Sequence, residues 1–374
     1  MNQERATRKK FHMILIVVMA IIIIVFDLVF IVMPDKETSE TENRSLQLFP
    51  RLTWATLTDG RFETNFDSYV ADQFPLRNSW LTVKTTVDRL SGKTESNGIF
   101  LGSDGYLIQD FTNPTDEKYE EILAEFTDFK SAHSDLDIYA LIAPTAITIL
   151  NDKLPLNAVT GDESGFMDRL KEDLESNGIT FIDTRDALNE EKQVNQVYYR
   201  TDHHWTTFGA YAAYNVLAET LDLSGKALTY DSKLVTDSFS GTLTASSGFR
   251  MDETDEIYIF EPQAETDYSV FYVDESEKTA SFYKTENLDI RDKYTVFFNG
   301  NHAEIKIETD AGGSDVLLVI KDSYANCFVP FLCQDYRKII MVDPRYYTGD
   351  LDELITTEKV TKVLYLYNAS SLSE

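Results

Sequence analysis

Cysteine is nearly absent from this sequence: its 374 residues include two, Cys327 and Cys333. Six residues apart on one helix, their Cα atoms would lie roughly 9 Å from each other, which is too far for a disulfide bond. We therefore expect both to be buried apolar residues, in a fold that does not depend on a disulfide. The scarcity of cysteine accordingly says little about the cell compartment.

Positive charge is also scarce, since 34 lysines and arginines stand against 63 aspartates and glutamates, a formal net charge of −29. An acidic surface repels nucleic acid and anionic lipid headgroups, which argues against a nucleic-acid function. A net negative charge also keeps a protein soluble, and solubility explains much of the excess of acidic residues. The chain has neither an internal repeat nor a low-complexity tract, so repeat architectures are excluded.

Apolar residues are plentiful, and the longest apolar run covers residues 11–33. At 1.5 Å per residue this run spans about 34 Å, enough to cross a hydrocarbon core of about 30 Å. Four basic residues precede the run and acidic residues follow it, which places residues 1–10 in the cytoplasm and the main domain outside. The run is too long for a signal-peptide core and no small-x-small cleavage site follows it. It therefore predicts an uncleaved, single-pass signal anchor.

One acidic residue, Asp27, lies inside this predicted membrane span. A carboxylate at that depth is costly, and such residues are usually paired or functional. Asp27 either lies near the outer interface or contacts a partner membrane protein.

The rest of the chain divides by its hydrophobic pattern. Residues 34–95 predict a polar linker and an amphipathic helical stalk, which the segment 74–78 interrupts. Residues 96–374 predict one α/β domain, because strands and helices alternate along them and such alternation is typical of a parallel sheet with helices on both faces. The polar residues 230–290 predict an insertion that faces solvent or substrate, and residues 294–307 predict a hairpin or an exposed turn around His302.

The elements of this domain are predicted from apolar runs and helical spacing. Two short strands joined by a glycine-containing turn are expected over residues 98–108. Further strands are expected at residues 138–143, 179–182, 316–320, 339–342 and 363–367. Helices are expected at residues 115–133, 166–174, 207–221, 324–332 and 350–355.

Ser323 follows the apolar run 316–320 after Lys321 and Asp322, where a strand should end and a helix begin. Ligands of open α/β sheets bind beyond the carboxyl ends of the strands, and free N–H groups of a helix start favour an anion there. Ser323 is thus a candidate nucleophile, with an oxyanion hole built from the amide of Ser323 or Tyr324 and the side chain of Asn326 or Asn301. The structural alternative is that Ser323 only caps the helix.

Asp202 and His204 are the candidate acid and base. Two positions apart in an extended segment, they would face the same way, which lets the carboxylate orient an imidazole toward a nucleophile. These residues could instead only cap and pack before the following helix. Zinc ligation by Asp202, His203 and His204 is a further alternative, but adjacent residues of an extended segment point to opposite sides. We therefore predict no metal and no cofactor.

The segment Thr201-Asp202-His203-His204-Trp205-Thr206 resembles the DHHW family of bacterial membrane-anchored proteins. The resemblance extends to Lys321-Asp322-Ser323-Tyr324-Ala325-Asn326 and to Asp343-Pro344-Arg345-Tyr346-Tyr347. That family in turn is similar to the SGNH-hydrolase-like domain of the alginate O-acetylation proteins, which have a small residue where this chain has Lys321-Asp322. The resemblance implies a flavodoxin-like SGNH fold, with Asp202 as orienting acid, His204 as base and Ser323 as nucleophile.

The resemblance also implies a function and a partner. We expect an extracytoplasmic O-acyltransferase of the cell envelope, specifically an O-acetyltransferase, that acts on a cell-surface or exported polysaccharide beside a membrane-bound O-acyltransferase. An esterase of the same fold, with water as acceptor, is the close alternative. A non-catalytic glycan-binding or scaffold protein of the envelope is the alternative from another class.

Overall fold

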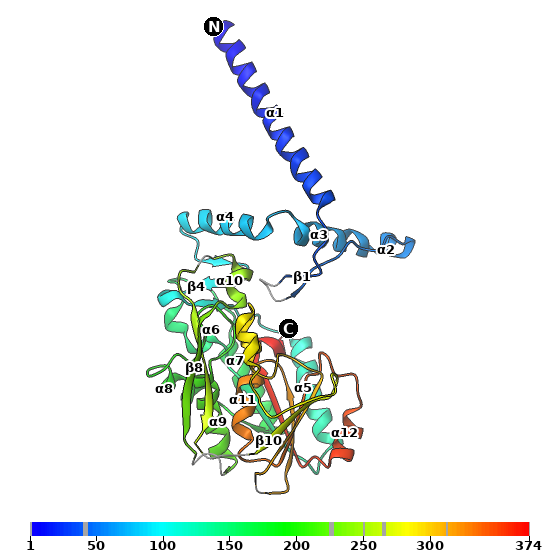
Figure 1. Ribbon diagram of the computed structural model, residues 1–374, viewed down its shortest axis with the longest axis vertical. Helices are drawn as coiled ribbons and strands as arrows, with labels where there is room; N and C mark the ends of the chain where they lie inside the picture. The colour runs from blue at the N-terminus through cyan, green and yellow to red at the C-terminus, as the bar shows by residue number, and fades with distance from the viewer. Residues whose placement is uncertain are drawn as a thin grey trace. The chain divides into compact units, whose positions relative to one another are not determined.

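The computed structural model describes residues 2–39, 44–223, 228–249, 251–263, 267–311 and 313–373 (Figure 1). The chain divides into two compact units, Met1–Val87 and Asp88–Glu374. The division falls inside one helix, eight residues before the boundary expected from the hydrophobic pattern at residue 95.

The first unit is helical. Helix α1 (Asn2–Val32) contains the stretch Lys10–Val32, whose length and mean hydropathy of 3.4 suffice for a membrane span. A two-stranded pair of β1 (Thr38–Ser39) and β2 (Arg44–Ser45) follows, and then α2 (Trp54–Thr58), α3 (Arg61–Gln73) and α4 (Arg77–Leu90). The expected interruption lies between α3 and α4, because Pro75 disfavours helical dihedrals at Phe74, whose ψ is 130°.

The second unit is built on a mixed sheet of eight strands in the order β11-β10-β12-β14-β13-β15-β6-β7. Strands β14, β13, β15, β6 and β7 are parallel, whereas β12, β10 and β11 are antiparallel to their neighbours. The α/β class is confirmed, but an all-parallel sheet is not. The bounds of the eight strands are β6 Asp137–Ala143, β7 Thr180–Phe181, β10 Tyr268–Tyr272, β11 Glu277–Thr279, β12 Glu304–Thr309, β13 Val316–Lys321, β14 Lys338–Val342 and β15 Lys362–Asn368.

Helices in the second unit fall into two groups by contact, one of α5, α7 and α13 and one of α8, α9 and α11. Every residue of β13 is buried, as expected for a central strand covered on both faces. The helices are α5 Asp116–Ala132, α6 Ala146–Ile149, α7 Glu163–Ser176, α8 Arg185–Glu191, α9 Thr207–Thr220, α10 Thr242–Ser247, α11 Ala325–Leu332, α12 Leu351–Glu358 and α13 Ala369–Ser373.

Small elements complete the second unit. The hairpin expected at residues 98–108 is present as β4 (Ile99–Leu101) and β5 (Leu107–Gln109), and β3 (Glu95–Ser96) pairs with β4. The short 3-10 helices are η1 Ser103–Gly105, η2 Asn151–Lys153, η4 Thr285–Asp289 and η5 Lys293–Val296. Of the two alternatives expected at residues 294–307, the hairpin is absent, because η5 precedes β12 and β12 pairs with β10 and β14 instead, whereas a turn with Asn299 and Asn301 exposed is present.

Residues 230–290, expected to be an insertion that faces solvent or substrate, are exposed along most of β8 but contribute to the core elsewhere. Strands β8 (Tyr230–Phe239) and β9 (Asp255–Pro262) pair with each other, and Ile257, Ile259 and Phe260 of β9 are buried. Strands β10 and β11 belong to the main sheet. The segment has a polar composition because its strands are only partly covered, and most residues of β8 are exposed, so its contribution to the core is hidden in the sequence.

Candidate active site

Ser323 lies in the turn between the end of β13 and the start of α11, and its side chain is partly exposed. Strand β13 lies in the interior of the parallel part of the sheet, between β14 and β15. The carboxyl ends of such strands form the edge at which α/β proteins bind ligands. The structure therefore places Ser323 at the edge expected from its sequence context.

Asp202, His204 and Ser323 form one line of hydrogen bonds, although about 120 residues separate the two segments. His204 Nδ1 lies 2.6 Å from Asp202 Oδ1, and His204 Nε2 lies 2.7 Å from Ser323 Oγ. An ionised carboxylate only accepts hydrogen bonds, so Nδ1 carries the proton and Nε2 accepts from the serine hydroxyl. This arrangement can move the hydroxyl proton to the imidazole.

Further hydrogen bonds hold the two segments together beside this line. Trp205 Nε1 donates to the Tyr324 carbonyl at 3.0 Å, and Tyr324 Oη donates to the His203 carbonyl. Trp205 and Tyr324 are both fully buried. Each large side chain thus reaches from its own segment to the backbone of the other, which fixes the distance between imidazole and hydroxyl.

Asp202 is buried and its carboxylate is held on both oxygens. Oδ1 accepts from the His204 amide at 3.0 Å, while Oδ2 accepts from the amide and the hydroxyl of Thr242 at 3.0 and 3.1 Å. Burial opposes the charge, but His203, His204 and these hydrogen bonds outweigh it and hold the pKa of Asp202 well below its usual range. Asp202 is therefore charged at neutral pH.

The loop before Asp202 is fixed by a second buried carboxylate, Asp255 at the start of β9. It accepts from the amides of Arg200 and Thr201 at 2.8 Å and from the Thr201 hydroxyl at 2.6 Å. Gly241 then lies so close that an added Cβ would stand 2.2 Å from Asp202 Cβ. The polar segment 230–290 thus supplies the residues that hold the candidate acid.

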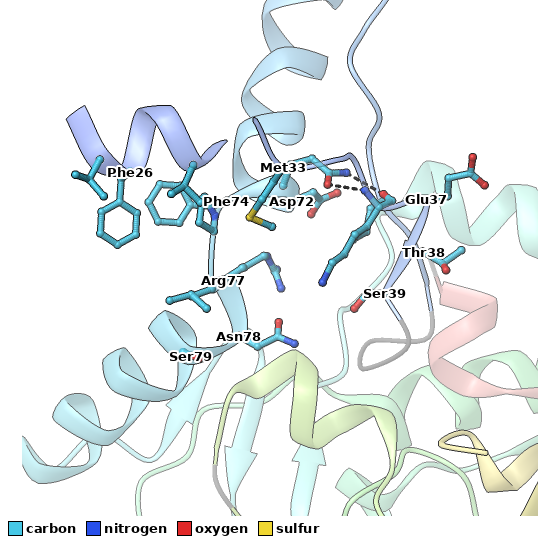
Figure 2. Close-up of a pocket in the computed structure, with 17 residues that line it drawn as sticks. Phe26, Met33, Glu37, Thr38, Ser39, Asp72, Phe74, Arg77, Asn78 and Ser79 are labelled. Atoms are coloured by element: carbon cyan, nitrogen blue, oxygen red, sulfur yellow. Dashed lines mark hydrogen bonds between the residues drawn. The ribbon is translucent and has the colours of Figure 1, made fainter. Parts of the chain in front are cut away.

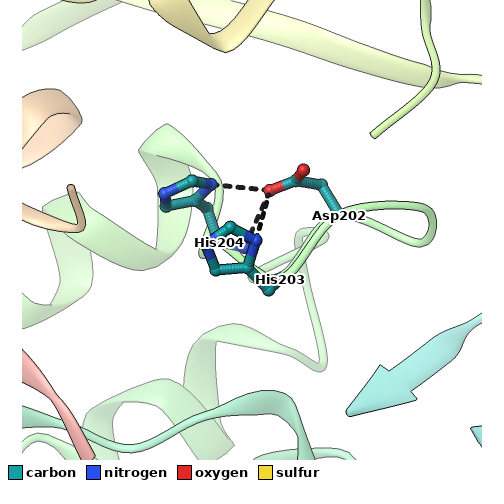
Figure 3. Close-up of side chains that lie close together, drawn as sticks. All are labelled: Asp202, His203 and His204. Atoms are coloured by element: carbon teal, nitrogen blue, oxygen red, sulfur yellow. Dashed lines mark hydrogen bonds and ion pairs between the residues drawn. The ribbon is translucent and has the colours of Figure 1, made fainter. Parts of the chain in front are cut away.

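His203 does not point away from His204, so the geometric reason against a shared metal was wrong. The segment bends at residues 201–204, and the two rings lie next to each other with centroids 3.9 Å apart and planes tilted by 37° (Figure 3). Ligand atoms of Asp202, His203 and His204 all lie within 4.8 Å of one another. Both nitrogens of His204 are already hydrogen-bonded, so an ion would have to displace Asp202 or Ser323 from that ring.

Lys321 and Asp322, where the alginate group has a small residue, are both buried and both shape the turn. Asp322 accepts from the amides of Tyr324 and Asn368, each at 2.8 Å, and from Asn368 Nδ2 at 2.7 Å. It therefore ties the Ser323 turn to the end of β15. Lys321 Nζ donates to Asn326 Oδ1 at 2.9 Å and to Asn301 Oδ1 at 3.1 Å.

These contacts separate the oxyanion candidates. The Tyr324 amide donates to Asp322, and Asn326 Nδ2 donates to the Gly300 carbonyl and Asn301 Oδ1, so their donors are already used within the fold. Asn301 is exposed and its Oδ1 is turned toward Lys321, which leaves its amide hydrogens directed elsewhere. Among the described residues, none accepts the Ser323 amide hydrogen.

Tyr294 is a site residue that the sequence did not reveal. Its ring stacks on His204 with centroids 3.8 Å apart and planes 12° apart, and its hydroxyl donates to the Ser323 carbonyl at 3.1 Å. Thr242 and Asp255 were missed as well. No local signal marks any of them, because each lies in a polar or irregular stretch and meets the site only through the fold.

Comparisons with known proteins fit this geometry. Residues 99–287, about half of the chain, match the model of a family described as the SGNH hydrolase-like domain of the acetyltransferase AlgX. This chain belongs to that family. The matched range of the AlgX family includes Asp202 and His204 and ends before Ser323. No curated protein matches the chain.

Solved structures share the fold. A DHHW family protein from Eubacterium siraeum has 21% identity and a TM-score of 0.60, and the alignment covers 75% of this chain and 93% of that one. PatB1 from Bacillus cereus, solved with a sulfonyl adduct, has 20% identity and a TM-score of 0.63 over 74% of this chain and 96% of that one. The resemblance to DHHW proteins and the SGNH-like α/β class are thus confirmed.

Cys327 and Cys333 are buried free thiols, as expected. Cys327 Sγ lies 3.4 Å from the Tyr294 oxygen, whose single hydrogen is donated to the Ser323 carbonyl, and is therefore close to the site. Burial raises the pKa of both thiols, Cys327 to about 12, so neither is a nucleophile at neutral pH.

Proposed function

We propose that this protein is a membrane-anchored O-acetyltransferase that carries an acetyl group on Ser323 and passes it to a hydroxyl of a cell-surface or exported polysaccharide. The observation that carries the proposal is the contact of 2.7 Å between Ser323 Oγ and His204 Nε2. Membership of the acetyltransferase AlgX family supports the acyl group. Helix α1 supplies the anchor, with residues 1–10 in the cytoplasm and the second unit outside.

The chemistry runs in two steps. Ser323 Oγ attacks the carbonyl carbon of the acetyl donor while His204 Nε2 takes the hydroxyl proton, and the same proton then passes to the leaving donor oxygen. In the second step His204 takes a proton from the acceptor hydroxyl, whose oxygen attacks the acetyl carbon. The bond from that carbon to Ser323 Oγ then breaks, and His204 returns the proton to Oγ. Asp202 remains ionised throughout and stabilises the imidazolium.

The anionic oxygen of each intermediate needs hydrogen-bond donors. The Ser323 amide and the exposed Asn301 side chain are the donors that we propose, since those of Tyr324 and Asn326 are used within the fold. One such donor is worth about 10²–10³ in kcat. In this proposal a membrane-bound O-acyltransferase partner supplies the acetyl group. The anchor would hold the protein in the same membrane as that partner.

Intact mass measurement of the full chain tests the nucleophile. Incubation with p-nitrophenyl acetate, or with an arylsulfonyl fluoride of the kind suggested by the PatB1 adduct, should add one group. Ser323→Ala and His204→Ala should abolish the adduct. Ser370→Ala is the matched control, because Ser370 lines the same small cavity as His203 and Tyr324 but is outside the hydrogen-bonded line, and this variant should still be labelled.

Acceptor dependence separates the alternatives. A transferase loses its acetyl adduct faster when polysaccharide is added, whereas an esterase loses it equally fast without acceptor. A scaffold protein forms no adduct and binds glycan equally well as wild type and as Ser323→Ala. That last outcome would remove the enzymatic proposal altogether.

A further inference from the structure

Helix α4 has its apolar residues on the outside. Thr85 is buried with 1% of its surface exposed and Leu81 is partly buried, while the other apolar residues of the helix and the residue before it are exposed. Their spacing of four, three, four and three residues places them along one side of the helix. This apolar stripe consists of Leu76, Trp80, Val83, Val87 and Leu90, which are 68%, 48%, 54%, 56% and 84% exposed.

The apolar stripe begins beside the candidate membrane span. The ring of Trp80 lies 5.8 Å from that of Phe26 in α1, and Phe74 stacks on the same ring at 5.9 Å. Phe26 is six residues before the end of the span at Val32, about 9 Å along a helix. Trp80 thus contacts the span about 9 Å from its end, within the depth of about 5–10 Å that the apolar face of an interfacial helix reaches.

A cavity of about 910 Å³ between α1 and the α3–α4 turn shows the same change of polarity. Figure 2 shows Phe26 and Phe74 at the left and Glu37, Thr38 and Ser39 at the right, with Arg77 and Asn78 below the space between them. The span and the end of α3 thus supply apolar side chains, whereas residues 37–39 and the start of α4 supply polar ones. This is the distribution expected of a segment that lies at a membrane–water interface.

We propose that α4 lies in the outer interface of the membrane, with its apolar stripe in contact with lipid. Amphipathic helices bind this region through their apolar face, and tryptophan is favoured there because its ring is apolar and its N–H is polar. Arg77 and Lys84 flank one edge of the stripe, where their long side chains can reach the headgroups. The surface is therefore assigned to lipid rather than to a protein partner.

This inference rests on the proposed span and not on the proposed chemistry. If α1 crosses the membrane, Phe26 brings Trp80 to the interface whatever the second unit catalyses. The second unit begins at Asp88, in the last turn of the same helix. Its point of attachment is consequently held at the membrane surface.

An environment-sensitive fluorophore on α4 tests the placement in the full chain, reconstituted in lipid nanodiscs. Val83→Cys puts the label on the stripe, and Arg89→Cys puts it on an exposed position of the same helix away from the stripe. The native cysteines are buried and will not react. The Val83→Cys label should emit at shorter wavelength, and nitroxide lipids should quench it several-fold more than the Arg89→Cys label.

Three results are distinguishable. Equal, water-like emission of both labels in nanodiscs overturns the inference, provided that alkaline carbonate leaves the protein in the membrane pellet. Water-like emission of the Val83→Cys label in nanodiscs together with shielding in native membranes overturns it in favour of a protein partner. If alkaline carbonate releases the protein from the membrane, both the proposed span and this inference are wrong. The acetyl adduct on Ser323 tests the proposed chemistry independently.

Discussion

Asp202 illustrates how much one side chain in this site depends on its neighbours. It accepts four hydrogen bonds from His204 and Thr242 and holds the imidazole in the tautomer that can take a proton from Ser323. The carboxylate therefore controls both the charge and the orientation of the base. Its neutral isostere keeps the shape and loses this control, which makes it the most informative substitution.

We expect Asp202→Asn to lower kcat for acetyl transfer by about 10³–10⁴-fold, because the amide favours the wrong tautomer of His204. KM should change little, since Asp202 is buried and cannot contact the substrate. Steady-state kinetics of wild type, Asp202→Asn and Ser323→Ala measure this. A variant with near wild-type kcat would show that Asp202 only supports the loop.

Lys321 predicts a pH dependence of stability. Burial lowers its pKa to about 8, against the attraction of Asp343, whereas the unfolded side chain has a pKa of about 10.4. Between these values the unfolded chain binds a proton that the folded chain lacks, so the free energy of unfolding rises with pH. The free energy of unfolding of the wild type should therefore rise, relative to that of Lys321→Met, by up to about 1.4 kcal/mol per pH unit above pH 8.

Urea unfolding of both proteins at pH 7.5, 8.5 and 9.5 measures this difference. Buried tyrosines contribute equally to both curves and cancel in the comparison. A difference in unfolding free energy that stays constant over this range would place the folded pKa of Lys321 near its unfolded value.

Metal removal distinguishes the triad from a zinc site. In the proposed mechanism Asp202 and His204 hold a proton between them, so dialysis against a chelator should leave the rate of acetyl transfer unchanged. Added zinc should inhibit, because an ion on His204 would displace Ser323 from its Nε2 atom. Loss of activity on dialysis, with recovery on adding zinc, would contradict the mechanism.

At the scale of elements, the turn between β13 and α11 depends on Asp322. Its carboxylate accepts three hydrogen bonds, one from its own turn and two from Asn368 at the end of β15. Asp322→Ala should lower the free energy of unfolding by about 2–4 kcal/mol, since each buried donor left unpaired costs about 1–3 kcal/mol. It should also lower kcat, because the turn positions Ser323.

Asp315→Ala is the matched control, because Asp315 lies just before β13, at its other end, and its half-exposed side chain pairs with Lys362 at 2.9 Å. A surface ion pair of this kind is worth less than about 1 kcal/mol. Thermal unfolding and kinetics of the two variants separate the effects. If Asp322→Ala and Asp315→Ala lose equal amounts of stability and activity, the hydrogen bonds of Asp322 contribute no more than a surface ion pair.

Elements differ in how well the sequence predicts them. Strands β6, β13, β14 and β15 were predicted because a strand covered on both faces is a continuous apolar run. Strands β8, β10 and β11 are polar and partly exposed, so the sequence does not mark them, whereas β9 contains the apolar run 257–260. The same polarity concealed that Thr242 and Asp255 hold the loop of Asp202.

At the scale of the whole molecule, the net charge of −29 predicts how acceptors bind. An acidic polysaccharide is repelled, and salt screens this repulsion, with a Debye length of about 10 Å at 0.1 M and about 3 Å at 1 M. KM for an acidic acceptor should therefore fall as salt is raised, while KM for a neutral acceptor stays constant. A rising KM for the acidic acceptor would instead indicate a local basic surface, such as the half-exposed Arg345.

The sequence by itself determined the apolar N-terminal helix, the buried parallel strands and the residue types of the site, since these follow from local hydrophobic pattern and short motifs. Only the tertiary structure decided that Ser323 meets His204, that Tyr294 stacks on the same ring, and that His203 lies over it. These contacts join residues from separate strands and loops, and no local pattern records a distance that the packing of the sheet sets.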